Sequence, residues 1–136
     1  MRITTIPILL LMLLSFAQNP ASDDKVDLGK EFKIKNGQQA ILKEGKLRIT
    51  FKSVKGDSRC PTGVACVWAG NGEVVIEVVR KNKKQVVATL NTFSEPKEIT
   101  YKGFKIKLVA LSPYPKINEP IDPKDYEATM VVTKDE

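Results

Sequence analysis

Apolar and polar residues alternate with a period of two along most of this chain, and this alternation predicts short β-strands. In the run 46–52, Leu47, Ile49 and Phe51 fall on one face, while the intervening positions are cationic or polar. Similar runs occupy 32–35, 39–42, 73–80, 85–90, 98–101, 104–108 and 126–132. Because no amphipathic helical pattern separates these runs, the sequence predicts an all-β protein of about eight short strands.

Close strand spacing of this kind is typical of an antiparallel two-sheet sandwich, immunoglobulin-like or related, with a small β-barrel as the alternative. The run 73–80 is nearly apolar on both faces, so we expect a central strand covered on each side. The segment 112–125 contains four prolines, and we expect it to cross from one sheet to the other. The residues predicted to face the core are Phe32, Ile34, Leu47, Ile49, Phe51, Val74, Ile76, Val78, Phe104, Ile106, Leu108, Met130 and Val132.

The amino-terminal segment differs from the rest in its composition. A charged start is followed by the apolar run 6–14 and then by Ser15-Phe16-Ala17, which has small residues at the two positions that a signal peptidase recognises, and this indicates an export signal cleaved after Ala17. The apolar run is too short to span a bilayer, so no stable membrane anchor is expected. The predicted organisation is therefore a signal peptide over 1–17, a flexible leader over 18–29 and one β-sandwich domain over 30–134, located in the periplasm or outside the cell.

The chain contains no histidine, and this absence removes the commonest general base and most transition-metal sites. Lysine and arginine number 22 against 16 acidic residues, and loss of Arg2 with the signal leaves a charge of about +5. The lysines are dispersed along the strands, so a nucleic-acid partner is not expected. No cofactor and no metal are predicted, and a monomer is expected.

Both cysteines and the only tryptophan lie in the segment 57–70, DSRCPTGVACVWAG. In an oxidising compartment Cys60 and Cys66 are expected to form a disulfide, because Pro61 and Gly63 favour a compact turn between them. Trp68 is expected to be core beside that disulfide. Asp57 and Arg59 are expected to pair with each other or to cap backbone amides of the loop. The candidate binding residues of this segment and its continuation are Asp57, Ser58, Arg59, Pro61 and Asn71.

Four features of the chain resemble a family of small exported bacterial proteins predicted to be β-sandwiches. They are the D-S-R-C-P run, the second cysteine five positions after that run, the V-W-A-G run, and a later D-Y element at Asp125 and Tyr126. The resemblance extends from about Gly29 to Val132. It implies export, the disulfide and the sandwich, and it implies no catalytic residue.

These patterns favour a non-catalytic secreted or periplasmic module that binds an unidentified protein, peptide or envelope polymer. One alternative is a protease inhibitor that presents the loop 57–66 as a rigid pseudo-substrate. A second alternative is an enzyme, either a redox protein using the cysteines or a glycosidase using a carboxylate pair, although neither spacing favours such chemistry.

Overall fold

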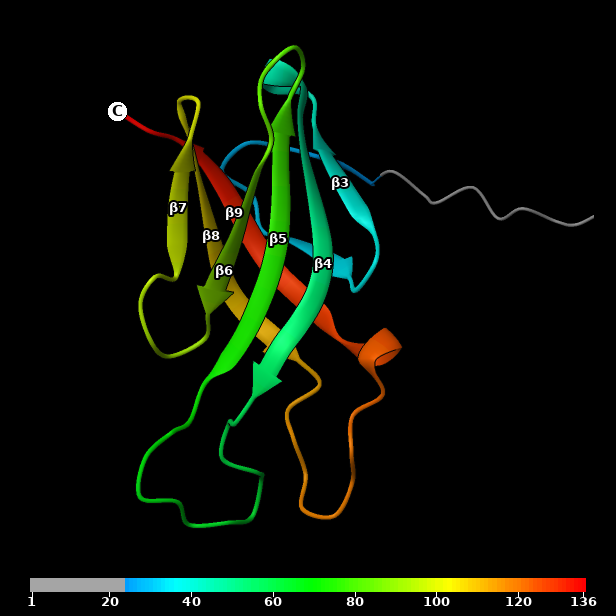
Figure 1. The fold of residues 1–136 in the computed structure, drawn as a ribbon, viewed down its shortest axis with the longest axis vertical. Helices are drawn as coiled ribbons and strands as arrows, with labels where there is room; N and C mark the ends of the chain where they lie inside the picture. The colour runs from blue at the N-terminus through cyan, green and yellow to red at the C-terminus, as the bar shows by residue number, and fades with distance from the viewer. Residues whose placement is uncertain (1–23) are drawn as a thin grey trace, which may run out of the picture.

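The computed structural model describes residues 24–136, which form two β-sheets packed face to face (Figure 1). The first sheet has the strand order β1-β3-β4-β5-β6, and the second has the order β2-β9-β8-β7. The strands are β1 (Asp24–Val26), β2 (Phe32–Lys35), β3 (Gln39–Leu42), β4 (Leu47–Asp57), β5 (Gly72–Arg80), β6 (Val86–Asn91), β7 (Glu98–Tyr101), β8 (Phe104–Ser112) and β9 (Glu127–Lys134). Two short 3-10 helices, η1 (Glu44–Lys46) and η2 (Pro123–Asp125), lie in the connections.

The predicted sandwich is confirmed, and the two sheets do not close into a barrel. Neighbouring strands pair antiparallel except β1 and β3, which run parallel with Asp24 opposite Ala40. The predicted signal peptide, 1–17, lies outside the described residues. Part of the predicted leader, however, is strand β1 and buries Val26, so the domain begins earlier than the expected residue 30. A run of three residues is too short for its alternation to be recognised.

The core lies between the two sheets and is made by the alternating faces of the strands. All the strand residues predicted to face the core are buried except Phe32, which is half-buried against the same cluster. The cluster also includes residues that the pattern did not single out, among them Leu42, Leu90, Leu111 and Tyr126. Strand β5 contributes Val74, Ile76 and Val78, whereas its other face is only half-buried. The expected covering of β5 on both sides is therefore wrong: its second face is the outer face of the first sheet.

The proline-rich segment after Ser112 does not cross between sheets, as the sequence had led us to expect. Strands β8 and β9 are antiparallel neighbours in one sheet, with Ser112 paired to Glu127, so this segment is a long hairpin connection. Its length and its prolines mark it as a loop, but they carry no information about which strand pairs with which. That pairing is decided by how the strands pack in the sheet.

Candidate functional site

Three connections gather at one end of the sandwich, which we call the loop end (Figure 1). They are the β4–β5 connection (58–71), the β6–β7 connection (92–97) and the β8–β9 connection (113–126). Backbone hydrogen bonds join them: Thr62 donates to the Pro115 carbonyl at 2.9 Å, and Thr92 donates to the Gly72 carbonyl at 3.0 Å. The loop end is therefore one connected surface and not three independent loops.

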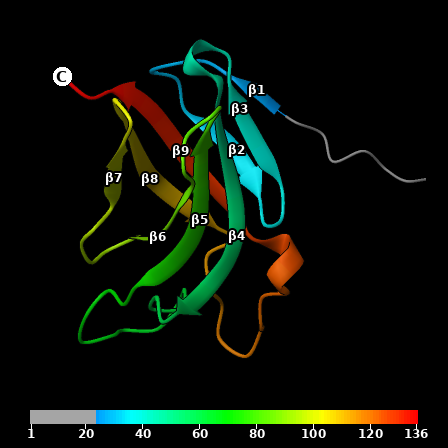
Figure 2. The same ribbon diagram turned by 45° about the horizontal axis from the view of Figure 1, so that its top comes forward.

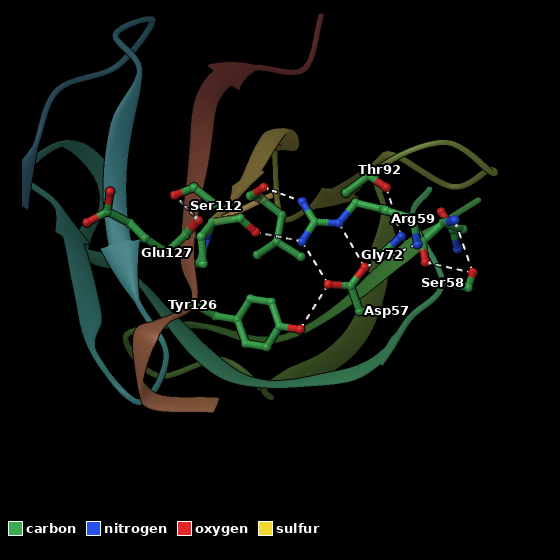
Figure 3. A network of polar contacts seen from close by, with 11 residues as sticks. Asp57, Ser58, Arg59, Gly72, Thr92, Ser112, Tyr126 and Glu127 are labelled. Atoms are coloured by element: carbon green, nitrogen blue, oxygen red, sulfur yellow. Dashed lines mark hydrogen bonds and ion pairs between the residues drawn. The ribbon is translucent and has the colours of Figure 1, made fainter. Parts of the chain in front are cut away.

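Arg59 holds the loop end together from inside, with only 6% of its surface exposed. Its guanidinium donates to both oxygens of Asp57, through Nε to Oδ1 at 2.8 Å and through Nη2 to Oδ2 at 2.7 Å (Figure 3). Two further donations reach the carbonyl of Leu111 near the end of β8 and the carbonyl of Pro113 at the start of the β8–β9 connection. The guanidinium also lies over the ring of Tyr114, 5.0 Å from the centroid. One side chain thus joins two loops that are more than fifty positions apart in the chain.

Asp57 and Tyr126 complete this polar cluster, because the Tyr126 hydroxyl donates to Asp57 Oδ2 at 2.9 Å (Figure 3). Burial alone would raise the pKa of Asp57, but the hydrogen bonds from Arg59 and Tyr126 and the charge of Arg59 outweigh it and lower that pKa. Burial, together with the hydrogen bond to Asp57 and its negative charge, raises the pKa of Tyr126 to about 12. Both Asp57 oxygens accept hydrogen bonds, so this carboxylate is fixed in place between Arg59 and Tyr126.

The expected pairing of Asp57 with Arg59 is therefore confirmed, while the part played by Tyr126 was not foreseen. Asp57 and Tyr126 are separated by 69 positions, and nothing in the local pattern relates them. The structure brings Asp57, Arg59 and Tyr126 into direct contact.

The disulfide between Cys60 and Cys66 is present, with the two Cα atoms 5.9 Å apart. It closes the outer part of the β4–β5 connection, and the base of that connection is held by the Cys60 amide, which donates to the Ala69 carbonyl at 2.9 Å. Gly70 is buried there with a φ of 72°, and a Cβ at this position would lie 1.9 Å from the Ser58 carbonyl oxygen. The two sides of the loop therefore approach closely only because residue 70 lacks a side chain.

Ser58 and Asn71 link this base to the β6–β7 connection. The Asn71 side-chain oxygen accepts hydrogen bonds from the amides of Phe93 and Ser94, and its Nδ2 donates to Asn91 Oδ1 at 2.9 Å. Ser58 donates through its amide to the Asn71 carbonyl at 2.8 Å. Four of the predicted binding residues, Asp57, Ser58, Arg59 and Asn71, are thus brought together, but their polar groups are used within the protein. Pro61, the fifth, is half-buried beside the disulfide.

Trp68 is not in the core, and this prediction is wrong. Its side chain is 58% exposed and meets only an edge of another exposed ring, Phe93, at 6.1 Å between centroids. The prediction assumed an extended chain from Cys66 to Trp68, but this stretch lies in a bend outside both sheets. The alternation rule that placed Trp68 beside the core holds only within a strand.

Trp68 belongs instead to a group of exposed apolar side chains at the loop end. Six of the nine large apolar residues exposed in the described chain lie on its three connections: Val64, Val67, Trp68, Phe93, Tyr114 and Ile117. Phe93 and Tyr114 also line a cavity of about 240 Å³, together with Arg59, Gly70, Leu111 and neighbouring residues. None of the six was predicted to be exposed: Trp68 was expected in the core, and a single apolar residue in a loop has no periodicity to reveal it.

Arg59 is too deeply buried to be the residue that an inhibitor offers to a protease. The inhibitor alternative stays a prediction, and the exposed residues of its loop, 57–66, are Ser58 and 62–66. The enzyme alternatives also stay predictions. In residues 24–136, acidic and cysteine side chains do not gather in threes or more in a way that could hold a metal ion.

In comparisons with protein families, curated proteins and solved structures, nothing matches this chain. The geometry of the loop end is therefore the basis for a functional proposal. Over residues 24–136 there is also no helix with the length and apolar character needed to cross a bilayer.

Proposed function

We propose that this chain is a non-catalytic binding module that acts in the periplasm or outside the cell and holds a protein partner at its loop end. The observation that carries the proposal is the concentration of exposed Val67, Trp68, Phe93, Tyr114 and Ile117 on connections that meet at one end. Aromatic side chains offer a large contact area and are enriched at the centres of protein interfaces. Such a cluster, exposed on a small domain, marks an interaction surface.

The polar cluster beneath this surface supports the proposal. Arg59 fixes the β8–β9 connection against the β4–β5 connection, and Asn71 fixes the β6–β7 connection against the β4–β5 connection. Loops that are held in one conformation before binding lose less conformational entropy when they bind. The buried network accordingly serves binding indirectly, by positioning the exposed apolar side chains above it.

Export is supported by the amino-terminal pattern and by the disulfide, which persists in an oxidising compartment. Amino-terminal sequencing of the protein recovered from its native host should identify Gln18 as the first residue. A product that begins at Met1 would contradict export by cleavage.

The binding proposal is tested by photocrosslinking in the native host. A benzoylphenylalanine in place of Val67 should give a discrete crosslinked product with one partner protein. The matched control is the same probe in place of Val87, which is also an exposed valine but lies on strand β6 outside the loop end. Adding Trp68→Ser to the Val67 probe should remove the product, because an interface loses most affinity when a central aromatic residue is removed.

Two results would overturn the proposal. One is the absence of any product from position 67 in cells that contain the folded protein. The other is the same set of products from positions 67 and 87, since this would show contact with abundant proteins regardless of surface.

A further inference from the structure

A second feature lies at the opposite end of the sandwich, where η1 and the β5–β6 turn approach each other (Figure 2). A groove of about 660 Å³ opens there, within the usual size of small-molecule sites. Its surface is mostly apolar, with Ile41 and Val79 on its floor, and no acidic residue lines it. Seven cationic side chains surround this apolar floor: Lys25, Lys43, Lys46, Arg48, Arg80, Lys81 and Lys83.

These seven cations have no acidic partners within the part of the chain that the structure describes. The six ion pairs within this part of the chain are made by other lysines and by Arg59, and none includes a cation of the groove. Two acids adjoin lining residues along the chain: Asp24 precedes Lys25 but makes no ion pair with it, and Glu44, which follows Lys43, is directed to Lys134, 4.0 Å away. Arg80 is held in place by donation to the Lys102 carbonyl at 3.2 Å and by the Phe104 ring. The groove therefore concentrates positive charge that nothing in residues 24–136 neutralises.

The groove has two chemically different parts. Between the two turns, a cavity of about 370 Å³ is lined by Lys43, Lys46, Arg80, Lys81 and Asn82, all of them cationic or polar. On the outer face of the first sheet, one residue from each of β1, β3, β4 and β5 lies opposite the next across neighbouring strands. In this order they are Lys25, Ile41, Arg48 and Val79. Four strands at the usual spacing make this row about 14 Å long. A strongly cationic pocket thus continues into a partly apolar track.

We propose that this groove binds a single-chain anionic amphiphile, with its phosphate group between the two turns and its acyl chain along Ile41 and Val79. A phosphate monoester would be surrounded by four cations, and the acyl chain would bury the apolar floor. A linear polyanion matches the charge equally well but gains nothing from Ile41 and Val79. This site is separate from the loop end, so each can fail without the other.

The test is calorimetric titration of the purified mature protein with lauroyl lysophosphatidate below its micelle concentration. Lauroyl lysophosphatidylcholine, which has the same chain and no net charge, and inorganic phosphate, which has no chain, are the comparison ligands. We expect lysophosphatidate to bind at least about tenfold more tightly than either of them.

Charge reversal then locates the site. The double variant Lys43→Glu with Arg48→Glu should weaken lysophosphatidate binding at least about tenfold. The control is Lys33→Glu with Lys107→Glu, which makes the same change of charge on exposed lysines of the other sheet. The control should leave the dissociation constant for lysophosphatidate within about twofold. Val79→Ser should weaken lysophosphatidate and leave phosphate binding unchanged. The proposal is overturned if inorganic phosphate binds as tightly as the lipid, or if both double variants lose binding equally.

Discussion

At the scale of single residues, Arg59 has the widest structural effect in the loop end. It satisfies the carboxylate of Asp57 and two carbonyls of another loop in a nearly water-free position. A buried ion pair adds little stability over an apolar substitute for both partners, but removal of one partner leaves an uncompensated charge. The cluster therefore specifies the arrangement of the loops more than it increases their stability.

Replacing Arg59 with methionine should lower the free energy of unfolding by about 3 to 5 kcal/mol, because Asp57 would remain buried without its cation. Urea denaturation followed by circular dichroism measures the change. Arg48→Met is the control: Arg48 is exposed on strand β4 and takes part in none of the six ion pairs within residues 24–136, so the loss should stay within about 0.5 kcal/mol. A loss as small as this for Arg59→Met would show that the buried pair is not a structural anchor.

Tyr126 gives the cluster a pH dependence. Its pKa in the folded protein, about 12, exceeds the ordinary value of 10.0, so the neutral phenol stabilises the fold below pH 10 and this contribution is lost as the pH rises towards 12. In an absorbance titration of phenolate formation, Tyr126→Phe should remove a step near pH 12. Disappearance of a step near pH 10 instead would contradict the buried hydrogen bond to Asp57.

Asp57 acts in the opposite direction. Its pKa is lowered in the folded protein, so the ionised carboxylate stabilises the fold at pH values above the ordinary pKa of 3.8. This stabilisation is lost as the pH falls below 3.8 and passes through the pKa of the folded protein. The cluster accordingly stabilises the loop end across the neutral range and weakens at both extremes of pH.

At the scale of elements, the β4–β5 connection is the part of the structure whose shape depends most on particular residues. The strands on either side of it follow the alternation rule, whereas the connection is held by the disulfide, by Arg59 and by the close approach at Gly70. Two of its glycines have positive φ, and they differ in what surrounds them: Gly63 at 84° faces open space, and Gly70 at 72° faces the backbone of Ser58.

This difference predicts unequal effects for the same substitution. Gly63→Ala carries only the strain of a left-handed alanine, about 1 to 2 kcal/mol. Gly70→Ala adds an overlap with backbone that cannot move aside, and the total loss of unfolding free energy should reach at least about 3 kcal/mol. Thermal and urea denaturation of the two variants provide the comparison. Equal losses would mean that the loop base is not as tightly closed as the structure indicates.

At the scale of the whole molecule, the second sheet is assembled from segments that are far apart in the chain. Strand β9 lies between β2 and β8, and it is the only strand in that sheet that pairs with β2 among the described residues. It also contributes Ala128, Met130 and Val132 to the core. The carboxyl-terminal strand is therefore needed for one of the two layers.

A chain that ends at Tyr126 should consequently show no cooperative unfolding transition by circular dichroism. A chain that ends at Lys134 is the matched control, because it keeps all of β9 and loses only the bond from the Asp135 amide to the Gly103 carbonyl. This control should unfold at the same temperature as the full chain within a few degrees, since one exposed terminal hydrogen bond contributes about 1 kcal/mol or less. A cooperative transition in the shorter chain would place the stability of the fold in the first sheet alone.

Except for strand β1 and the outer face of β5, the sequence by itself determined where the strands lie and which of their faces is buried, and it also determined which two residues are cross-linked. These features depend on local rules: the period of two fixes the buried face of each strand, and a short spacing with proline and glycine brings Cys60 and Cys66 together. Runs such as 46–52 and 104–108 were therefore recognisable without any knowledge of their neighbours. The same rules failed at Trp68, where the chain leaves the strand conformation.

Only the tertiary structure decided which strands are neighbours. It therefore also decided every contact and surface that is built from segments distant in the sequence. Alternation tells which face of a strand is buried, but it does not tell which strand lies beside it. The contact of Arg59 with the β8–β9 connection, the bond from Tyr126 to Asp57 and the gathering of lysines around Ile41 and Val79 all follow from that choice. Both proposed binding surfaces are products of strand pairing, because each is built from residues that meet only once the sheets have formed.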